Sequence, residues 1–285
     1  MLRVIREIGE MRAVLAAARA EGKSIGLVPT MGALHQGHLS LAARSVADND
    51  TTVVSIFVNP LQFGPGEDFE RYPRDLDGDC RLLAGAGVDW VFAVSAEAMY
   101  PEGFRTYVVQ ESLTERLCGR SRPGHFRGVT TVCTKLFNIV QPDRAYFGQK
   151  DYQQTVIIRH LLEDLNFAIQ LVVLPTVREP DGLAMSSRNR YLTRDERRRA
   201  TVLVQSLRLA QRLVTEGERR AAVVRKAMRS KIESCEGAAI DYVEIVDPET
   251  LEPLEEVTGP AVAAIAVWVG QVRLIDNEVL SVPGC

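Results

Sequence analysis

The sequence has no long apolar run, almost no net charge and no paired-cysteine pattern, and each absence excludes a class of protein. Its 285 residues carry a formal net charge of −3, so no general attraction to nucleic acid or to an anionic membrane is expected. The apolar stretches end well short of the roughly 18 residues that indicate a membrane-spanning helix. The five cysteines are scattered and lack CxxC spacing. This predicts reduced thiols, and neither a disulfide framework nor a zinc site.

The remaining composition is that of a globular protein. Apolar residues make up 46% of the chain and charged residues 25%, which allows one or two domains with a sizeable core. Residues 1–20 mix charged and apolar positions, so we expect an amphipathic helix there and not the continuous apolar segment of a secretory signal. Together with the unpaired cysteines, this predicts a cytoplasmic location. The sequence contains no internal repeat and no low-complexity tract.

Apolar, β-branched runs alternate with helical patterns over the first 175 residues or so. Strands are expected at Ser24–Pro29, Thr52–Val58, Trp90–Val94, Arg144–Phe147 and Ile169–Pro175. Helices are expected around residues 38–48, 75–86, 125–140 and 153–165. Short apolar strands that alternate with helices predict a parallel sheet covered on both faces. We therefore predict an α/β fold, with a Rossmann-like, doubly wound domain over residues 1–176.

The pattern changes after residue 176. Residues 194–233 are helical and basic, and residues 240–280 contain three β-like runs around the acidic loop Asp247–Glu256. A smaller C-terminal α+β domain is expected over residues 177–285. Its basic helices could contact RNA or form a solvated face. The interleaved acidic residues and the lack of aromatic residues favour the solvated face.

Two of the four histidines lie three residues apart in a glycine-containing turn. The segment Pro29–His38 follows an apolar strand pattern and precedes a helical one, so His35 and His38 are expected at a strand-to-helix junction. Backbone N–H groups and the positive end of the helix dipole favour an anion at such a junction. No cysteine or acidic neighbour completes a metal site. Phosphate contact is the favoured interpretation, and core packing is the alternative.

Amide side chains follow the next predicted strand. Asn59 and Gln62 belong to the segment Phe57–Gly64, and ligands of open α/β sheets bind at the carboxyl ends of strands. Amides carry both donors and acceptors, so they suit a hydroxylated substrate. The alternative for Asn59 is an Asn-Pro turn in which its side chain binds its own backbone.

Two charged clusters each allow two interpretations. Asp75, Asp77 and Asp79 could stabilise the N-terminus of a helix, or one of them could help to hold Mg²⁺ beside substrate phosphates. Arg122 and His125 precede and open another helix. They could contact an anion at its N-terminus, or they could belong to a rigid Pro-Gly loop.

A second strand-to-helix junction contains a glycine and a lysine. Gly148 allows close approach of the backbone to a ligand, and Lys150 is a compact charge suited to a phosphate. Asp151 could bond ribose hydroxyls or cap the following helix, in which Gln154 lies one turn inward.

The loop Arg178–Asn189 joins the two predicted domains. The hydroxyls of Ser186 and Ser187, the backbone N–H groups and the guanidinium of Arg188 could together surround a polyphosphate. The loop could also act as a lid, and a polar linker is the alternative.

Six of these segments occur in the order and spacing of one known family. They run from residue 29 to about residue 193 and read PTMGALHQGH, FVNPLQFG, YPR, RPGHFRGV, FGQKDYQQ and DGLAMSSRN. The His-x-x-His turn and the Met-Ser-Ser-Arg loop also occur, in looser form, in other nucleotidyltransferases and in class I aminoacyl-tRNA synthetases. The other motifs are more specific. The chain resembles the pantoate–β-alanine ligases, also called pantothenate synthetases.

The resemblance implies a reaction. These enzymes use ATP and Mg²⁺ to condense pantoate with β-alanine to pantothenate, a precursor of coenzyme A. The reaction proceeds through an enzyme-bound pantoyl adenylate and releases AMP and pyrophosphate. The resemblance also implies a homodimer formed through the first domain, a second domain that closes over the active site, and no nucleic-acid or membrane partner.

The resemblance also implies site residues. Catalytic roles fall to His35, His38, Lys150, Ser186, Ser187 and Arg188. ATP binding falls to Pro29, Met31, His38, Gly148, Lys150, Asp151, Val177, Met185, Ser186, Ser187 and Arg188. Pantoate binding falls to Met31, Asn59, Gln62, Tyr72 and Gln154. Asp79 is expected as the metal ligand because Gly78 stands where several relatives carry an acid.

Two other functions compete with this one. Another nucleotidyltransferase would share the His-x-x-His turn but would leave Gln62 and Gln154 unexplained. An RNA- or nucleotide-binding regulator would use the basic helices after residue 194 and would leave the motifs of the first domain without a purpose.

Overall fold

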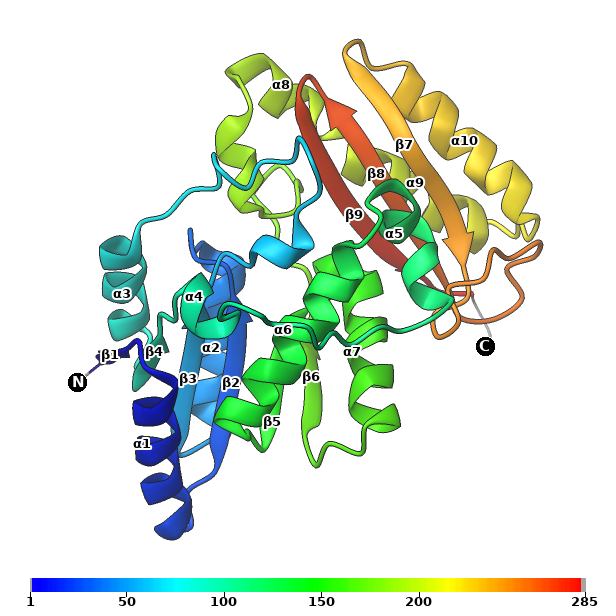
Figure 1. Cartoon of the computed structure of the whole chain (residues 1–285). Helices are drawn as coiled ribbons and strands as arrows, with labels where there is room; N and C mark the ends of the chain where they lie inside the picture. Colours follow the sequence, from blue (N-terminus) through cyan, green and yellow to red (C-terminus); the bar gives the residue numbers. More distant parts are fainter. Residues whose placement is uncertain (1, 283–285) are drawn as a thin grey trace. The chain divides into compact units, whose positions relative to one another are not determined.

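The computed structural model describes residues 2–282 and contains one parallel and one antiparallel sheet (Figure 1). Each sheet belongs to a separate unit of the chain. Unit 1 comprises Met1–Thr114, Arg122–Gly148 and Ile157–Pro175, and unit 2 comprises Glu115–Ser121, Gln149–Val156 and Thr176–Cys285. The last segment of unit 2 begins at Thr176, next to the expected boundary after residue 176. Two shorter segments upstream, Glu115–Ser121 and Gln149–Val156, belong to unit 2 as well.

The sheet of unit 1 has six parallel strands in the order β1-β4-β3-β2-β5-β6. The strands are β1 (Arg3–Ile5), β2 (Ile25–Thr30), β3 (Thr51–Ile56), β4 (Trp90–Phe92), β5 (Arg144–Gly148) and β6 (Gln170–Leu174). From β2 the chain winds through β3 to β4, and it then returns to form β5 and β6 on the other side of β2. The predicted doubly wound fold is confirmed. Its switch point lies between β2 and β5, where such sheets bind ligands.

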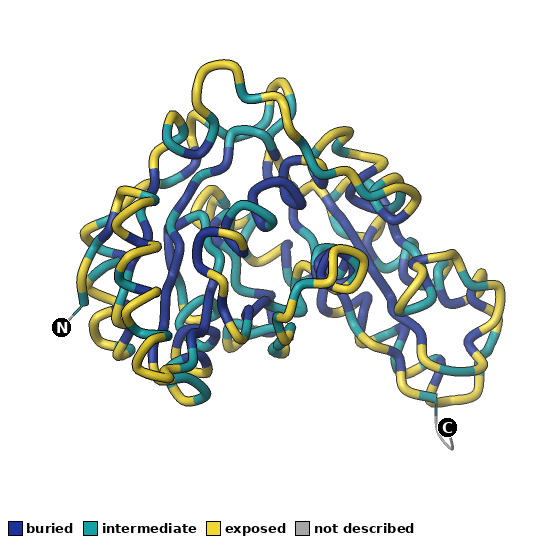
Figure 2. The backbone as a smooth tube through the Cα atoms, turned by 60° about the horizontal axis from the view of Figure 1, so that its bottom comes forward, coloured by how far each residue is buried: buried dark blue, intermediate teal, exposed yellow. Residues whose placement is uncertain are grey.

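Helices cover both faces of this sheet. They are α1 (Ile8–Ala20), α2 (Gln36–Asp48), α3 (Leu76–Gly85), α4 (Ala96–Met99), α6 (His125–Val140) and α7 (Tyr152–Asp164). On one face, Leu41 of α2 and Leu83 of α3 pack with Val28 and Val54 of the central strands. On the other face, α6 packs against α1 and β2. The central strands β2, β3 and β5 are largely buried, whereas edge strand β6 is partly exposed and the outer faces of the helices are exposed (Figure 2).

Unit 2 is built on an antiparallel sheet of three strands, which confirms the predicted α+β part. Its elements are α5 (Leu117–Ser121), α8 (Arg194–Arg199), α9 (Val202–Thr215), α10 (Ala221–Glu233), β7 (Ala238–Val246), β8 (Ala261–Val269) and β9 (Val272–Leu280). Leu207 of α9 and Met228 of α10 are fully buried in one core with Ile265 and Val267 of β8.

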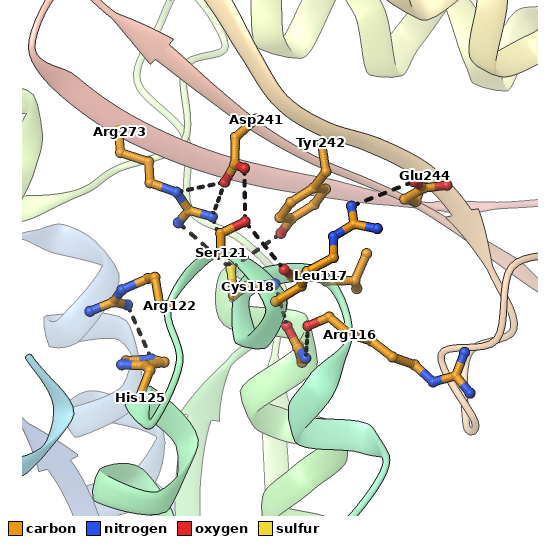
Figure 3. Close-up of polar contacts among 12 residues, drawn as sticks. Arg116, Leu117, Cys118, Ser121, Arg122, His125, Asp241, Tyr242, Glu244 and Arg273 are labelled. Atoms are coloured by element: carbon orange, nitrogen blue, oxygen red, sulfur yellow. Dashed lines mark hydrogen bonds and ion pairs between the residues drawn. The ribbon is translucent and has the colours of Figure 1, made fainter. Parts of the chain in front are cut away.

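Short helix α5 is tied to this sheet by polar side chains (Figure 3). Ser121 Oγ donates to Asp241 at 2.8 Å, and the same carboxylate accepts two bonds from Arg273 of β9. The Cys118 thiol lies 3.2 Å from the Tyr242 hydroxyl. These contacts explain why residues 115–121 belong to unit 2.

Five arginines of the basic segment 194–233 form ion pairs with acidic residues. Described pairs are Arg197–Asp181, Arg198–Asp195, Arg199–Glu236, Arg220–Glu218 and Arg225–Glu244. This pairing favours the solvated, charge-balanced face over an RNA-binding face.

Several local predictions differ from the structure. Residues 1–20 were expected to be helical, but Arg3–Ile5 is an edge strand that pairs with β4, and the helix begins only at Ile8. A three-residue strand is too short to show an alternating pattern, so the charges of the following helix dominated the prediction. Cys80, Cys118, Cys133 and Cys235 are unpaired as expected, and Cys285 lies outside the described residues. Among residues 2–282, no helix has the length and apolar character to span a membrane.

The contact between β2 and α2 leaves no room for a side chain at Gly26. A Cβ there would lie 2.1 Å from Ser45 Oγ and 2.5 Å from Asn49 Nδ2. We expect Gly26→Ala to lower the free energy of unfolding by about 2 kcal/mol, because it overpacks this contact. Urea denaturation measures the change. Gly9→Ala on α1 is the matched control, since a Cβ there meets no atom within 4 Å, and it should not lower stability.

Candidate functional site

The loops that carry the sequence-predicted residues of unit 1 leave the same edge of the sheet. Strands β2 and β3 run parallel and end side by side at Thr30 and Ile56. Pro29 lies within β2, and Gly148 is the last residue of β5. The carboxyl edge of the sheet therefore presents the histidine turn and the Asn59 segment next to each other.

The histidine turn has a left-handed backbone held by a buried carboxylate. Gly32 and Ala33 have φ angles of +80° and +52°. The backbone amides of Ala33 and Leu34 point the same way, and each donates to the Asp79 carboxylate at 2.8 Å. Asp79 is only 3% exposed. Its carboxylate therefore fixes the turn after which His35 caps helix α2.

The two histidines are held in a defined tautomer. His35 Nδ1 accepts from Gly37 N–H at 3.1 Å, and His38 Nδ1 accepts from His35 N–H at 3.4 Å. The ring centroids lie 4.1 Å apart. Because each Nδ1 is an acceptor, the proton of each neutral ring is on Nε2. This tautomer can donate a hydrogen bond to a phosphate oxygen.

An amide cluster follows β3. Gln62 Nε2 donates to the Met31 sulfur at 2.9 Å, and Gln62 Oε1 accepts from Asn59 Nδ2 at 3.1 Å. Asn59 Nδ2 also donates to the Gly128 carbonyl, and Asn59 Oδ1 accepts from the Tyr100 hydroxyl at 2.8 Å. Asn59 is 1% exposed and Gln62 is 9% exposed. The structure thus brings together three of the residues predicted to bind pantoate.

The short 3₁₀ helix η1 (Pro60–Gln62) that carries this cluster packs directly on α6. A Cβ at Gly128 would lie 2.3 Å from the Leu61 carbonyl oxygen, so only glycine allows this backbone approach. Tyr72, also predicted to bind pantoate, is buried beside the ring of Phe63, with centroids 6.0 Å apart. Arg122 binds Glu67, and both Arg122 and His125 bind the Gln62 carbonyl of η1, which favours the rigid-loop interpretation over direct anion contact.

In unit 2, strand β9 holds both of the predicted phosphate segments. Asn277 Nδ2 donates to the carbonyls of Gln149 and Lys150, both at 2.9 Å, and so fixes η3 (Gln149–Asp151). Its neighbour Asp276 accepts two bonds from Arg178, at 2.7 and 3.1 Å. Asp276 and Asn277 are adjacent residues of β9, and this strand also contacts η4 (Ser187–Tyr191).

The loop before η4 is a tight, internally bonded turn. Arg178 donates to the Gly182 carbonyl, and Met185 N–H donates to the Val177 carbonyl at 3.0 Å. Ser186 Oγ accepts from Arg188 N–H at 3.3 Å and so caps η4, while Ser187 is buried. The Met-Ser-Ser-Arg segment therefore lies in a compact turn that is held by hydrogen bonds within the loop.

The predicted site residues are divided between the units. Those of unit 1 are Pro29, Met31, His35, His38, Asn59, Gln62, Tyr72, Asp79 and Gly148. Those of unit 2 are Lys150, Asp151, Gln154, Val177, Met185, Ser186, Ser187 and Arg188. Lys150 Nζ lies 3.8 Å from Asp151 Oδ1, and Gln154 is a partly buried residue of the first turn of α7.

Comparison with known proteins identifies the family. The model of the pantoate-beta-alanine ligase family matches residues 3–279, nearly the whole chain. The chain belongs to the pantoate–β-alanine ligase family. Family members are enzymes that ligate pantoate and β-alanine in pantothenate biosynthesis and use ATP, and this chain is one of them.

Relatives and solved structures of the ligase family match over almost their full length. A pantothenate synthetase of Moorella thermoacetica is 60% identical over 281 residues, which is 99% of each chain. One from Thermotoga neapolitana is 56% identical, covering 98% of this chain and 100% of the relative. The crystal structure of pantothenate synthetase from Thermus thermophilus has a TM-score of 0.92 at 47% identity, covering 97% of this chain and 98% of that chain.

A second solved relative carries ligands. The pantoate-beta-alanine ligase from Francisella tularensis, complexed with beta-gamma ATP and beta-alanine, has a TM-score of 0.82 at 34% identity and covers 98% of both chains. The similarity extends over both units, so it includes β9 and the loops that this strand holds.

Sequence reasoning missed the residues that support this ligase site. Asp276 and Asn277 form the only adjacent pair of buried polar side chains among the described residues of β9. The run of three polar residues, Asp276–Glu278, within the predicted β region 240–280 was a usable signal. Glu67, which pairs with Arg122, had no comparable signal because it stands in an acidic loop where a charged residue is ordinary.

Asp79 does not fit the expected role of metal ligand. Both of its oxygens accept backbone N–H groups, and its neighbour Gly78 offers no side chain. Within residues 2–282, no group of three or more His, Cys, Asp or Glu side chains could hold a metal ion. The contacts of Asp79 are instead those of a residue that maintains the backbone turn.

We expect Asp79→Asn to lower the free energy of unfolding by about 2–3 kcal/mol, with no Mg²⁺ or ATP present. The amide keeps one acceptor but turns an N–H₂ donor toward a backbone N–H. Urea denaturation measures the loss. Asp77→Asn, an exposed position of the same helical turn, is the control and should change stability by no more than about 0.5 kcal/mol. Unchanged stability of Asp79→Asn would return the residue to consideration as a ligand.

Proposed function

We propose that this ligase acts through a pantoyl adenylate. A carboxylate oxygen of pantoate attacks the α-phosphorus of ATP, the bond to the bridging oxygen breaks, and pyrophosphate leaves. The amine of β-alanine then attacks the activated carbonyl carbon, AMP leaves with the electrons of the C–O bond, and the amine loses a proton. Both steps need alignment and charge stabilisation, and neither needs a covalent bond to the enzyme.

His35 and His38 would stabilise the first step. Charge on the phosphate oxygens redistributes as the α-phosphorus is attacked, and donors already aimed at them require no rearrangement at that moment. The backbone bonds to both Nδ1 atoms support this role, because they put the proton on Nε2. The positive end of α2 adds to the same field.

Residues of unit 2, together with three of unit 1, would bind the rest of the nucleotide. We assign the phosphates to Lys150, Ser186, Ser187 and Arg188, and the ribose side to Gly148 and Asp151. Pro29, Met31, Val177 and Met185 would contact the nucleotide through their backbone or apolar surface. The anchoring of η3 by Asn277 and of the Arg178 loop by Asp276 supports this assignment, since a phosphate clamp must be preorganised.

Pantoate would bind to the amides of Gln62 and Gln154, with Met31, Asn59 and Tyr72 lining its pocket. Gln62 supports this role because its amide lies, nearly buried, in a bonded cluster beside the histidine turn. This cluster is the observation that carries the proposal. A nucleotidyltransferase with a different acceptor would not need the bonded amides of Asn59 and Gln62 at the carboxyl edge of the parallel sheet.

Mg²⁺ remains an expectation from the family. The described residues offer no cluster of protein ligands for it, so we propose that the ion is held through the phosphates of ATP. No step above depends on a protein ligand to the metal.

Three further features belong to the same proposal. The second domain, residues 177–285, would close over the active site, and its loop 182–189 would keep water from the adenylate. The enzyme would be a homodimer formed through the first domain. A cytoplasmic location is proposed from the unpaired cysteines.

Isotope exchange between pyrophosphate and ATP tests the reaction. With Mg²⁺ present and β-alanine absent, we expect exchange only when pantoate is added, because adenylation is reversible and needs no amine. An absence of pantoate-dependent exchange in folded protein would contradict the proposal. Exchange that depends on another acid would point to a different nucleotidyltransferase, and salt-sensitive RNA binding without exchange would favour a regulator.

His38→Ala should slow adenylation about a hundredfold and weaken ATP binding far less, if the imidazole acts mainly in the transition state. Single-turnover adenylation and equilibrium nucleotide binding give the two numbers. His160→Ala, on the distal part of α7, is the control. Equal losses in rate and binding would show that His38 serves ground-state binding alone.

A further inference from the structure

In unit 1, Arg122 and His125 both lie at the backbone carbonyl of Gln62, and Glu67 binds Arg122. The Arg122 guanidinium binds the Glu67 carboxylate through two bonds, Nε to Oε1 at 2.7 Å and Nη2 to Oε2 at 2.6 Å. Arg122 Nη2 also donates to the Gln62 carbonyl oxygen at 3.2 Å, and His125 Nδ1 lies 2.8 Å from the same oxygen. The network closes between Arg122 Nη1 and His125 Nε2, at 3.1 Å (Figure 3).

The partners of His125 fix its protonation state. A carbonyl oxygen can only accept, so Nδ1 must carry a proton. A guanidinium can only donate, so Nε2 must be without one. The network therefore requires the neutral imidazole, in the Nδ1–H tautomer. This is the opposite tautomer to that of His35 and His38.

Protonation of His125 would break one side of this network. The new Nε2–H would face an Arg122 N–H, and two positive charges would lie about 3 Å apart. Two charged groups lie at His125: Arg122, from the segment before α6, is 3.1 Å away, and Glu67, from the loop after η1, interacts with it electrostatically. Burial raises the pKa of Glu67, but its bonds to Arg122 outweigh this and hold that pKa below its usual value. The Glu67 carboxylate therefore stays ionised and paired with Arg122, and its charge also acts on His125.

We propose that Glu67, Arg122 and His125 are positioning residues for the acid-binding amide of Gln62, and that they make pantoate affinity depend on a neutral His125. The inference rests on the proposed function of Gln62. The single turn of η1 has few internal bonds, so its position depends on contacts to the Gln62 carbonyl and to α6. A small displacement of a substrate-binding group has large kinetic effects.

The test is the KM for pantoate in pyrophosphate–ATP exchange, measured from about pH 5.5 to 8, where imidazoles titrate. In the native enzyme we expect this KM to rise about tenfold toward low pH, as the neutral form of His125 is lost. His125→Asn keeps an N–H donor near the Nδ1 position but does not titrate. Its KM for pantoate should rise clearly less over the same range than that of the native enzyme, and its KM for ATP should follow that of the native enzyme.

His160→Asn is the matched control and should retain the native profile. Because His35 and His38 are unchanged in both variants, their titration cancels in the comparison. The proposal is overturned if native enzyme and His125→Asn show the same pH dependence of the pantoate KM, or if the variant affects ATP and pantoate equally. Native enzyme without pantoate-dependent exchange at any pH would overturn the proposed function itself, a distinguishable result.

Glu67→Gln provides a second measurement that does not alter the histidine. The amide retains the shape of the carboxylate but loses its charge, so Arg122 is held less firmly. We expect a raised KM for pantoate at pH 8, an unchanged KM for ATP and native circular dichroism. An unchanged pantoate KM would exclude Glu67 from the positioning network.

Discussion

The carboxylate of Asp79 accepts two backbone amides from a turn that lies more than forty positions earlier in the chain. Those amides belong to a turn with two successive left-handed residues, one of them Ala33, a conformation that costs free energy in any residue other than glycine. If these buried amides had no hydrogen-bond acceptor, the folded state would lose still more free energy. The carboxylate offsets both costs and thereby fixes the start of α2. The histidines, their tautomers and their stacking all depend on where that helix begins.

The same device recurs at another loop. The buried amide of Asn277 binds the carbonyls of Gln149 and Lys150. A loop that leaves a sheet retains backbone groups that the strands cannot pair, so a buried polar side chain from a distant element pairs them. Each such side chain occupies a buried position that an apolar residue could fill, and in return it holds the loop rigid. Rigid loops are what a reaction governed by alignment requires.

The regular strands and helices of the fold could be predicted from the sequence. Strands β2 to β6 follow from short apolar runs between helical patterns, and their expected limits differ from the observed ones by one or two residues. The segment Arg3–Ile5 could not be recognised, because three residues show no periodicity and their partner strand lies far along the chain. The site was predictable where motifs mark a strand end, as at His35 and Gln62. The contacts of Asp79, Arg122 and His125 could not be predicted, since an ionisable residue before or within a helix can serve many roles.

The interleaving of the two units has a consequence for how the polypeptide acquires its structure. Three segments of unit 1 alternate with three of unit 2, so the chain passes between the units five times. No single cut separates them: a fragment that starts at Thr176 would lack α5, and with it the partners of Asp241 and Tyr242 on the sheet. During synthesis, the segments Glu115–Ser121 and Gln149–Val156 leave the ribosome long before β7, β8 and β9 exist. These early segments must wait for those strands, so unit 2 completes its folding only after Leu280 has been synthesised.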